Sequence, residues 1–218
     1  MQQVSREPIT FSELLAKPGV LEVSDLRSRF GFCAFHGGNL ERMTEQIASE
    51  AAARSGSSFY AVIQPAGMRH HIPSALVSPD ESPELKAFIE HCDVVVALHG
   101  YGRRGHFTSL LCGGQNRELA AHVAHHVRAV LPAYRTIDEI EEIPRALRGL
   151  HPDNPCNLSS NGGVQLELPP RVRGLSPLAR HWPSNSAGMK RFPHVNHLID
   201  GLVTAAASWP VRESVTTS

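Results

Sequence analysis

The sequence predicts a single α/β domain of three layers, built on a mixed, mostly parallel central sheet. Apolar strand-like runs alternate along the chain with helical segments, which is the order typical of layered α/β domains. A chain of 218 residues with 41% hydrophobic side chains is long enough to bury one substantial core. We therefore expect one domain over residues 1–209, followed by a flexible polar tail over residues 210–218.

Each element is predicted from its local pattern. Short apolar runs predict four strands, at residues 30–35, 58–63, 94–98 and 164–168. Segments rich in helix formers predict three helices, at residues 44–53, 117–131 and 195–208. Gly56, Pro132 and Pro210 lie just beyond these segments and mark their ends.

The composition excludes several classes of protein. The 21 basic and 21 acidic side chains balance, which argues against nucleic-acid binding and against a polybasic membrane-surface module. We see no secretory signal and no apolar run near the ~20 residues that span a bilayer, so we expect a cytoplasmic protein, which lysis would also release. Four scattered cysteines without a C-x-x-C pair argue against a zinc ribbon or a redox dithiol. The absence of a G-x-S-x-G elbow argues against a serine hydrolase.

Two predicted strands each deliver a histidine to their carboxyl end. The run at 30–35 leads into His36 and glycine, and the run at 94–98 leads into His99 and glycine. Ligands of open α/β sheets bind outside the carboxyl ends of the strands, so the two imidazoles are placed to converge. Glycine at these points lets the backbone turn sharply and leaves room for an ion or a substrate.

Glu41 offers a third ligand, five residues after His36 and close to the start of the next helix. Two histidines and one carboxylate form a catalytic zinc set that leaves a fourth position for water. In the alternative interpretation, the histidines are turn residues at strand ends, and Glu41 is a charge favoured by the helix dipole. The spacing alone leaves both interpretations open.

Glu167 lies on the polar face of the last predicted strand, which alternates apolar and polar residues as VQLEL. On a half-exposed sheet this face would simply meet solvent. If it faces a metal cleft instead, Glu167 becomes a candidate general base for a metal-activated water.

Several segments together resemble the poly-γ-glutamate hydrolase family, whose best-known members are phage-derived zinc peptidases with a carboxypeptidase-like α/β fold. The similar segments lie between about residues 30 and 173 and occur in the family's order: AFHGGNLE, VVVALHGYG, LLCGGQN, NPCN and GGVQLELPPRVRG. The MRHHIPS segment also looks like the family's HITS segment. The resemblance implies a zinc ion held by His36, Glu41 and His99, with Glu167 as the catalytic carboxylate, and places Asn157 in a motif that positions or faces substrate.

Together with the histidine and carboxylate pattern, the resemblance implies a zinc-dependent hydrolase of amide bonds, the γ-glutamyl bonds of poly-γ-glutamate or of related acidic peptides. Arg103, just after the His99 turn, and Arg173 are our candidates for binding a substrate carboxylate through a bidentate guanidinium. The alternatives are a zinc amidohydrolase of small N-acyl amino acids and a non-catalytic binding protein that keeps the fold. The sequence does not indicate an oligomeric state.

Overall fold

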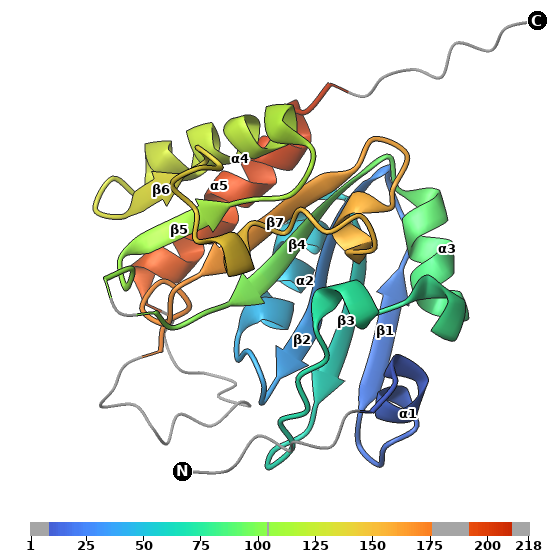
Figure 1. Ribbon diagram of the computed structural model, residues 1–218. Helices are drawn as coiled ribbons and strands as arrows, with labels where there is room; N and C mark the ends of the chain where they lie inside the picture. The colour runs from blue at the N-terminus through green and yellow to red at the C-terminus, as the bar shows by residue number, and fades with distance from the viewer. Residues whose placement is uncertain (1–8, 104, 176–191, 211–218) are drawn as a thin grey trace, which may run out of the picture.

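A computed structural model describes residues 9–103, 105–175 and 192–210 of the chain. Most of the predicted tail, residues 211–218, lies outside the described residues. The described part is a three-layer α/β arrangement around one sheet, as the alternating pattern predicted (Figure 1). No helix in these ranges is both long and apolar enough to cross a membrane.

The central sheet has seven strands in the order β1-β3-β2-β4-β7-β5-β6. Neighbouring strands among β3, β2, β4 and β7 are parallel, whereas β1 and β5 are antiparallel to β3 and β7, respectively. β6 pairs parallel with β5, so the sheet is mixed with a parallel centre. The strands are β1 (Leu21–Asp25), β2 (Phe30–Gly38), β3 (Ser58–Gln64), β4 (Val94–Gly100), β5 (Ser109–Cys112), β6 (Arg135–Ile137) and β7 (Gly163–Leu168).

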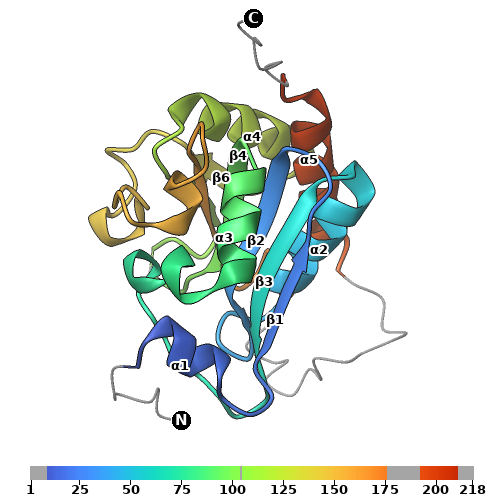
Figure 2. The ribbon, with the colours of Figure 1, turned by 90° about the vertical axis from the view of Figure 1, so that its right-hand side faces the viewer.

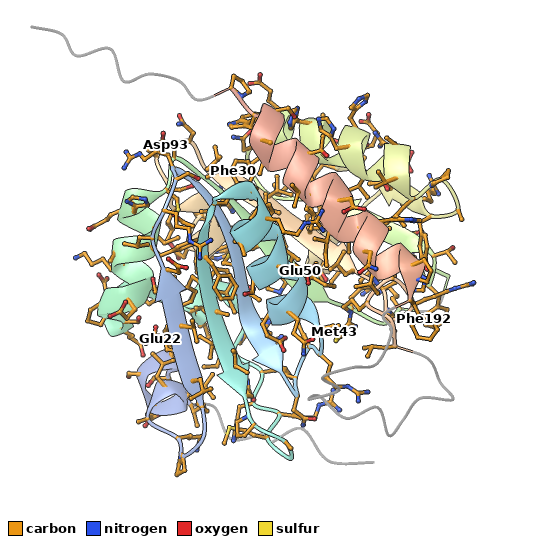
Figure 3. All side chains as sticks on the ribbon, turned by 180° about the vertical axis from the view of Figure 1, so that it is seen from behind. Glu22, Phe30, Met43, Glu50, Asp93 and Phe192 are labelled. Carbon is orange, nitrogen blue, oxygen red and sulfur yellow. The ribbon has the colours of Figure 1, made fainter. Side chains whose placement is uncertain are left out.

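Helices cover both faces of the sheet. One face carries α2, α4 and α5, which form the larger apolar core with it, and Figure 3 shows α2 and α5 lying across this face. The opposite face carries α1 and α3, with a second apolar core beneath them (Figure 2). The helices are α1 (Phe11–Leu15), α2 (Thr44–Ser55), α3 (Pro83–His91), α4 (Arg117–Val130) and α5 (Pro193–Ser208), and the short 3-10 turns are η1 (Ser74–Leu76), η2 (Pro79–Glu81), η3 (Arg145–Leu147) and η4 (Pro155–Asn157).

The alternation of side chains along the central strands divides them between the two cores. In β4, Val96 and Leu98 contribute to the core under α2, α4 and α5, and Val95 and Ala97 to the core under α1 and α3. His99 is the next residue in the second series. Its side chain therefore lies on the α1 and α3 face, at the carboxyl end of the strand.

Candidate active site

Two of the predicted site residues lie side by side at the carboxyl ends of β4 and β7. His99 and Glu167 are direct partners in the parallel register of these strands, so their side chains share one face of the sheet. His99 is 3% exposed and Glu167 is 4% exposed. Glu167 is therefore buried beside a histidine, and the interpretation that it meets solvent on a half-exposed sheet does not hold.

A bulge in β2 brings His36 to the same place. Between the pairs Ala34–Ala61 and Gly37–Ile63, β2 contains one more residue than β3. A regular strand would turn Phe35 and His36 to opposite faces, whereas an extra residue re-aims the side chain that follows it. As a result, the His36 ring lies 5.1 Å from the His99 ring, between centroids.

A short loop between β2 and α2, fixed by backbone hydrogen bonds, places Glu41 next to these two histidines. The N–H of Glu41 donates to the carbonyl of His36 at 2.9 Å, and the Glu41 carbonyl accepts the N–H of Thr44 at the start of α2. Gly38 makes the turn possible, because its φ is +69° and a Cβ there would collide with the backbone of Gln64 in β3.

The carboxylate of Glu41 lies between the two imidazoles. Oε1 is 3.1 Å from Nδ1 of His36, and Oε2 is 3.5 Å from Nδ1 of His99. Oε2 also accepts the backbone N–H of Gly100 at 2.8 Å. The candidate ligand atoms of the three residues all lie within 4.8 Å of one another, and the described residues contain no second group of this kind.

The chemistry of these donors fits a metal ion. Nε2 of His36 is 2.8 Å from the carbonyl of Ile72, which can only accept, so Nε2 carries a hydrogen. In the neutral ring, Nδ1 is then an acceptor that faces another acceptor, Oε1 of Glu41, and a cation or a proton must lie between them. A second ring nitrogen bonded to a backbone carbonyl is the usual way to orient a metal-binding histidine. In His99, Nε2 is buried without a hydrogen-bond partner among the described residues, so its nitrogens are not satisfied by protein groups alone.

The two buried carboxylates differ in their electrostatics. Burial raises the pKa of Glu167 to about 7, and the nearby charge of His99 opposes this only in part. Burial also acts to raise the pKa of Glu41, but the charges and hydrogen bonds of His36 and His99 outweigh it and lower that pKa. The surroundings of Glu41 thus favour the ionised form that a ligand requires, whereas burial favours the protonated form of Glu167, which suits a group that takes up and releases a proton.

The three residues predicted to bind substrate differ in exposure and in what they contact. Arg173 is 5% exposed, and its guanidinium donates to the carbonyls of Leu168 and Arg42. It packs so closely on Gly100 that a Cβ there would lie 2.6 Å from the guanidinium carbon. Arg103 is exposed on the loop after β4.

Asn157 precedes β7 and so lies toward the opposite end of that strand from Glu167. Its amide nitrogen donates to the carbonyls of Gly149 at 2.7 Å and His151 at 3.0 Å. Its oxygen accepts the backbone N–H of Gln115 at 3.0 Å. These contacts join three loop segments, so the geometry favours the positioning role over direct contact with substrate.

Sequence reasoning missed two side chains near the site. The ring of His71 lies 4.9 Å from the ring of His36, and the amide of Gln165 donates to Glu167 at 2.9 Å. The signals were present in the MRHHIPS segment and in the polar face of VQLEL, which Gln165 shares with Glu167. Neither segment, taken as sequence alone, indicates which residues these side chains contact in the fold.

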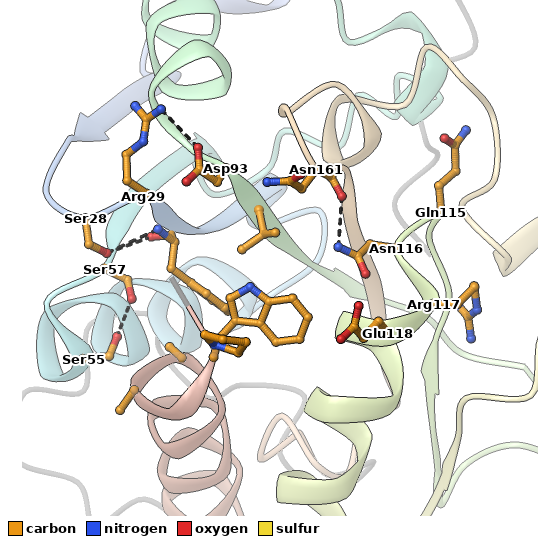
Figure 4. Close-up of a pocket in the computed structure, with 16 residues that line it drawn as sticks. Ser28, Arg29, Ser55, Ser57, Asp93, Gln115, Asn116, Arg117, Glu118 and Asn161 are labelled. Carbon is orange, nitrogen blue, oxygen red and sulfur yellow. Dashed lines mark hydrogen bonds and ion pairs between the residues drawn. The ribbon is translucent and has the colours of Figure 1, made fainter. Parts of the chain in front are cut away.

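A separate pocket of about 720 Å³ lies at the amino ends of β2 and β4, between one end each of α2, α4 and α5 (Figure 4). Its charged and polar groups have protein partners: Arg29 pairs with Asp93 at 3.1 Å, and Asn116 donates to the carbonyl of Asn161 at 2.9 Å. It contains none of the candidate site residues. The site therefore lies at the end of the sheet where α/β folds bind ligands, and this pocket lies at the other end.

Comparisons with known proteins show the same fold in solved structures. The solved structure of a bacteriophage poly-gamma-glutamate hydrolase has a TM-score of 0.75 at 19% identity, and the match covers 90% of this chain and 93% of that one. A structure described as the zinc-free apo form of YNDL has a TM-score of 0.70 at 20% identity, with 87% and 90% covered. At these identities the two structures show a shared fold.

No sequence among the curated proteins matches this chain. A family model, described as poly-gamma-glutamate hydrolase, matches residues 11–187, which is well over half of the chain. The chain therefore belongs to the poly-gamma-glutamate hydrolase family, a family of hydrolases.

Proposed function

We propose that this hydrolase is zinc-dependent and cleaves the γ-glutamyl amide bonds of poly-γ-glutamate or of related acidic peptides. The observation that carries the proposal is the convergence of His36, Glu41 and His99, with Glu167 directly opposite His99. The family supports the substrate class, and a relative of the same fold is described in a zinc-free apo form.

His36, Glu41 and His99 would hold the metal through one ring nitrogen of each histidine and the carboxylate of Glu41. A zinc ion bound there would lower the pKa of a water molecule toward ~7 and would polarise the scissile carbonyl. The carboxylate of Glu167 takes the proton from the attacking water and returns it to the leaving amine. Because Glu167 is buried, bulk water does not compete for that proton.

A γ-glutamyl polymer carries one carboxylate on every residue, so its recognition requires fixed positive charge near the scissile bond. Arg103 is the candidate that is exposed and follows directly after the His99 turn. Arg173, whose guanidinium packs against Gly100, adds a buried positive charge. Asn157 stabilises the loops that precede β7 through its hydrogen bonds.

The proposal is tested by zinc content and by hydrolysis. Purified protein is expected to contain one zinc per chain and to cleave poly-γ-glutamate faster than α-linked polyglutamate. Zinc with cleavage of small N-acyl amino acids only would favour the amidohydrolase alternative. Protein that binds no zinc and cleaves neither substrate would support the binding-protein alternative and refute the proposal.

A further inference from the structure

Gln165 holds the carboxylate of Glu167 from within the same strand. It lies two residues before Glu167 in β7, on the same face, and is 5% exposed. Its Nε2 donates to Oε1 of Glu167 at 2.9 Å. Its Oε1 accepts a hydrogen bond of 2.7 Å from Nδ2 of Asn154, which is 2% exposed.

A backbone group fixes the direction of these bonds. The N–H of Cys156, which can only donate, bonds to Oδ1 of Asn154 at 3.3 Å. The other end of the Asn154 amide, facing Gln165, must therefore be the NH₂ group. Gln165 accordingly turns its oxygen to Asn154 and its NH₂ to Glu167. We refer to these groups, from the Cys156 N–H through Asn154 and Gln165 to Glu167, as the amide chain.

Gly149, in the loop before β7, packs closely against the side chain of Gln165. Gly149 has a φ of +64°, and a Cβ there would lie 2.6 Å from Cβ of Gln165 and 2.9 Å from its Oε1. The carbonyl of Gly149 is in turn bonded by the amide of Asn157 at 2.7 Å. Gln165 is therefore held between Gly149 on one side and Glu167 on the other, and the hydrogen bonds at the two ends of its amide decide which end faces the carboxylate.

We propose that Gln165 is a positioning residue for Glu167 and that Asn154, with the carbonyl of Leu147 at 3.5 Å from Nε2 of Gln165, sets which end of the Gln165 amide the carboxylate meets. The inference rests on the proposed function, in which Glu167 is the general base. A donor at Oε1 holds the carboxylate in one orientation, whereas a reversed amide would place oxygen against oxygen and displace it. Small displacements of a catalytic group reduce the rate of the chemical step more than they reduce substrate binding.

The substitution Asn154→Asp tests the direction of the amide chain while leaving Gln165 and Glu167 in place. The new carboxylate still accepts the Cys156 N–H but has no NH₂ group, so it attracts the NH₂ of Gln165 and turns the Gln165 oxygen toward Glu167. We expect kcat on poly-γ-glutamate to fall roughly ten- to a hundredfold, the range for losing one hydrogen bond to a charged group, with KM and zinc content unchanged.

Gln165→Leu, which keeps the size of the side chain, is expected to lower kcat by a similar factor. The double variant should lose little more than either single one, because both act through the same bond. If the two losses multiply instead, the residues act independently and the inference is overturned.

Asn116→Asp is the matched control. Like Asn154, Asn116 accepts a backbone N–H with its Oδ1, from Leu119, and donates one bond from Nδ2, to the carbonyl of Asn161. It lies at the other end of the sheet, beside the pocket of Figure 4. We expect wild-type kcat for this variant. Equal losses in Asn116→Asp and Asn154→Asp would show a general effect of the substitution and overturn the inference.

A measurement that does not depend on catalysis can test this inference separately from the proposed function. In a ¹H–¹⁵N spectrum, the side-chain NH₂ of Gln165 is identified by its loss in Gln165→Leu. The chemical shift of this NH₂ signal is expected to change in Asn154→Asp and to stay unchanged in Asn116→Asp. If wild-type protein fails to cleave poly-γ-glutamate, the proposed function fails while this test still applies. A Gln165 signal that does not move in Asn154→Asp overturns the amide chain, whatever the catalytic result.

Discussion

Replacing Glu167 by Gln separates proton transfer from metal binding. Glu167 is not one of the three residues whose candidate ligand atoms converge, so in the proposed function its charge is not needed to hold a metal ion. Glutamine has nearly the same size, and its oxygen can still accept the 2.9 Å bond from Gln165. The variant therefore removes the proton acceptor from a buried position without opening a cavity or leaving the Gln165 NH₂ group without a partner.

The expected magnitude follows from these contacts. A positioned general base contributes about 10²–10⁴-fold to a rate, which corresponds to roughly 3–5 kcal/mol of barrier at 1.36 kcal/mol per tenfold. Stability should change by less than about 1 kcal/mol, because neither packing nor the number of hydrogen bonds from Gln165 changes. We therefore expect kcat to fall at least a hundredfold at constant zinc content and melting temperature.

Three measurements on the same preparation decide the outcome: kcat on poly-γ-glutamate, zinc per chain by plasma emission spectroscopy, and thermal unfolding. A variant with wild-type kcat would show that Glu167 takes no part in the chemistry. A variant that has lost its zinc would make Glu167 a ligand, and one of His36, Glu41 and His99 would have to be withdrawn from the proposed set.

Other substitutions test the metal site, the turn and the substrate contact. His36→Ala should leave purified protein without zinc, whereas His125→Ala, in α4 beside His126, should keep one zinc per chain; the opposite pattern would show that the proposed site is misplaced. Gly38→Ala should lower the free energy of unfolding in denaturant by roughly 1–3 kcal/mol more than Gly56→Ala, because both positions have positive φ but only Gly38 meets the backbone of β3. Arg103→Ala should raise KM for an acidic peptide about tenfold at low salt and less at high salt, and a KM that is unchanged at every salt concentration would remove Arg103 from substrate binding.

Local patterns predicted the centre of the fold but not its edges. The four predicted strands became β2, β3, β4 and β7. The apolar runs of β2, β3 and β4 suit strands that are buried on both faces of a parallel sheet, and β7 was predicted from the alternation of VQLEL. The three predicted helices became α2, α4 and α5. β1 was missed since its LEVSD sequence is half polar, as suits an edge strand, and β5 and β6 are only four and three residues long. α3 did carry a signal, in the Ser82 cap followed by Pro83.

The candidate site shows a similar division. The positions of His36 and His99 at strand ends predicted their approach, because the carboxyl ends of parallel strands meet at one edge. The bulge that turns His36 toward His99 has no local signature, since it depends on the register with β3. The carbonyl of Ile72, which fixes the His36 tautomer, lies 36 residues further along the chain. Contacts of this length are properties of the folded chain rather than of any motif.

Arg173 shows how the fold balances charge in this buried site. Burial disfavours the charged form of both carboxylates, Glu41 and Glu167, and only at Glu41 do the neighbouring histidines outweigh it and lower the pKa. The Arg173 guanidinium interacts favourably with both carboxylates, yet its hydrogen bonds to described residues go to the backbone carbonyls of Leu168 and Arg42. It therefore supplies positive charge without occupying the oxygens needed for a ligand or for a proton. Gly100 makes this possible, because any larger residue would push the guanidinium away from the site.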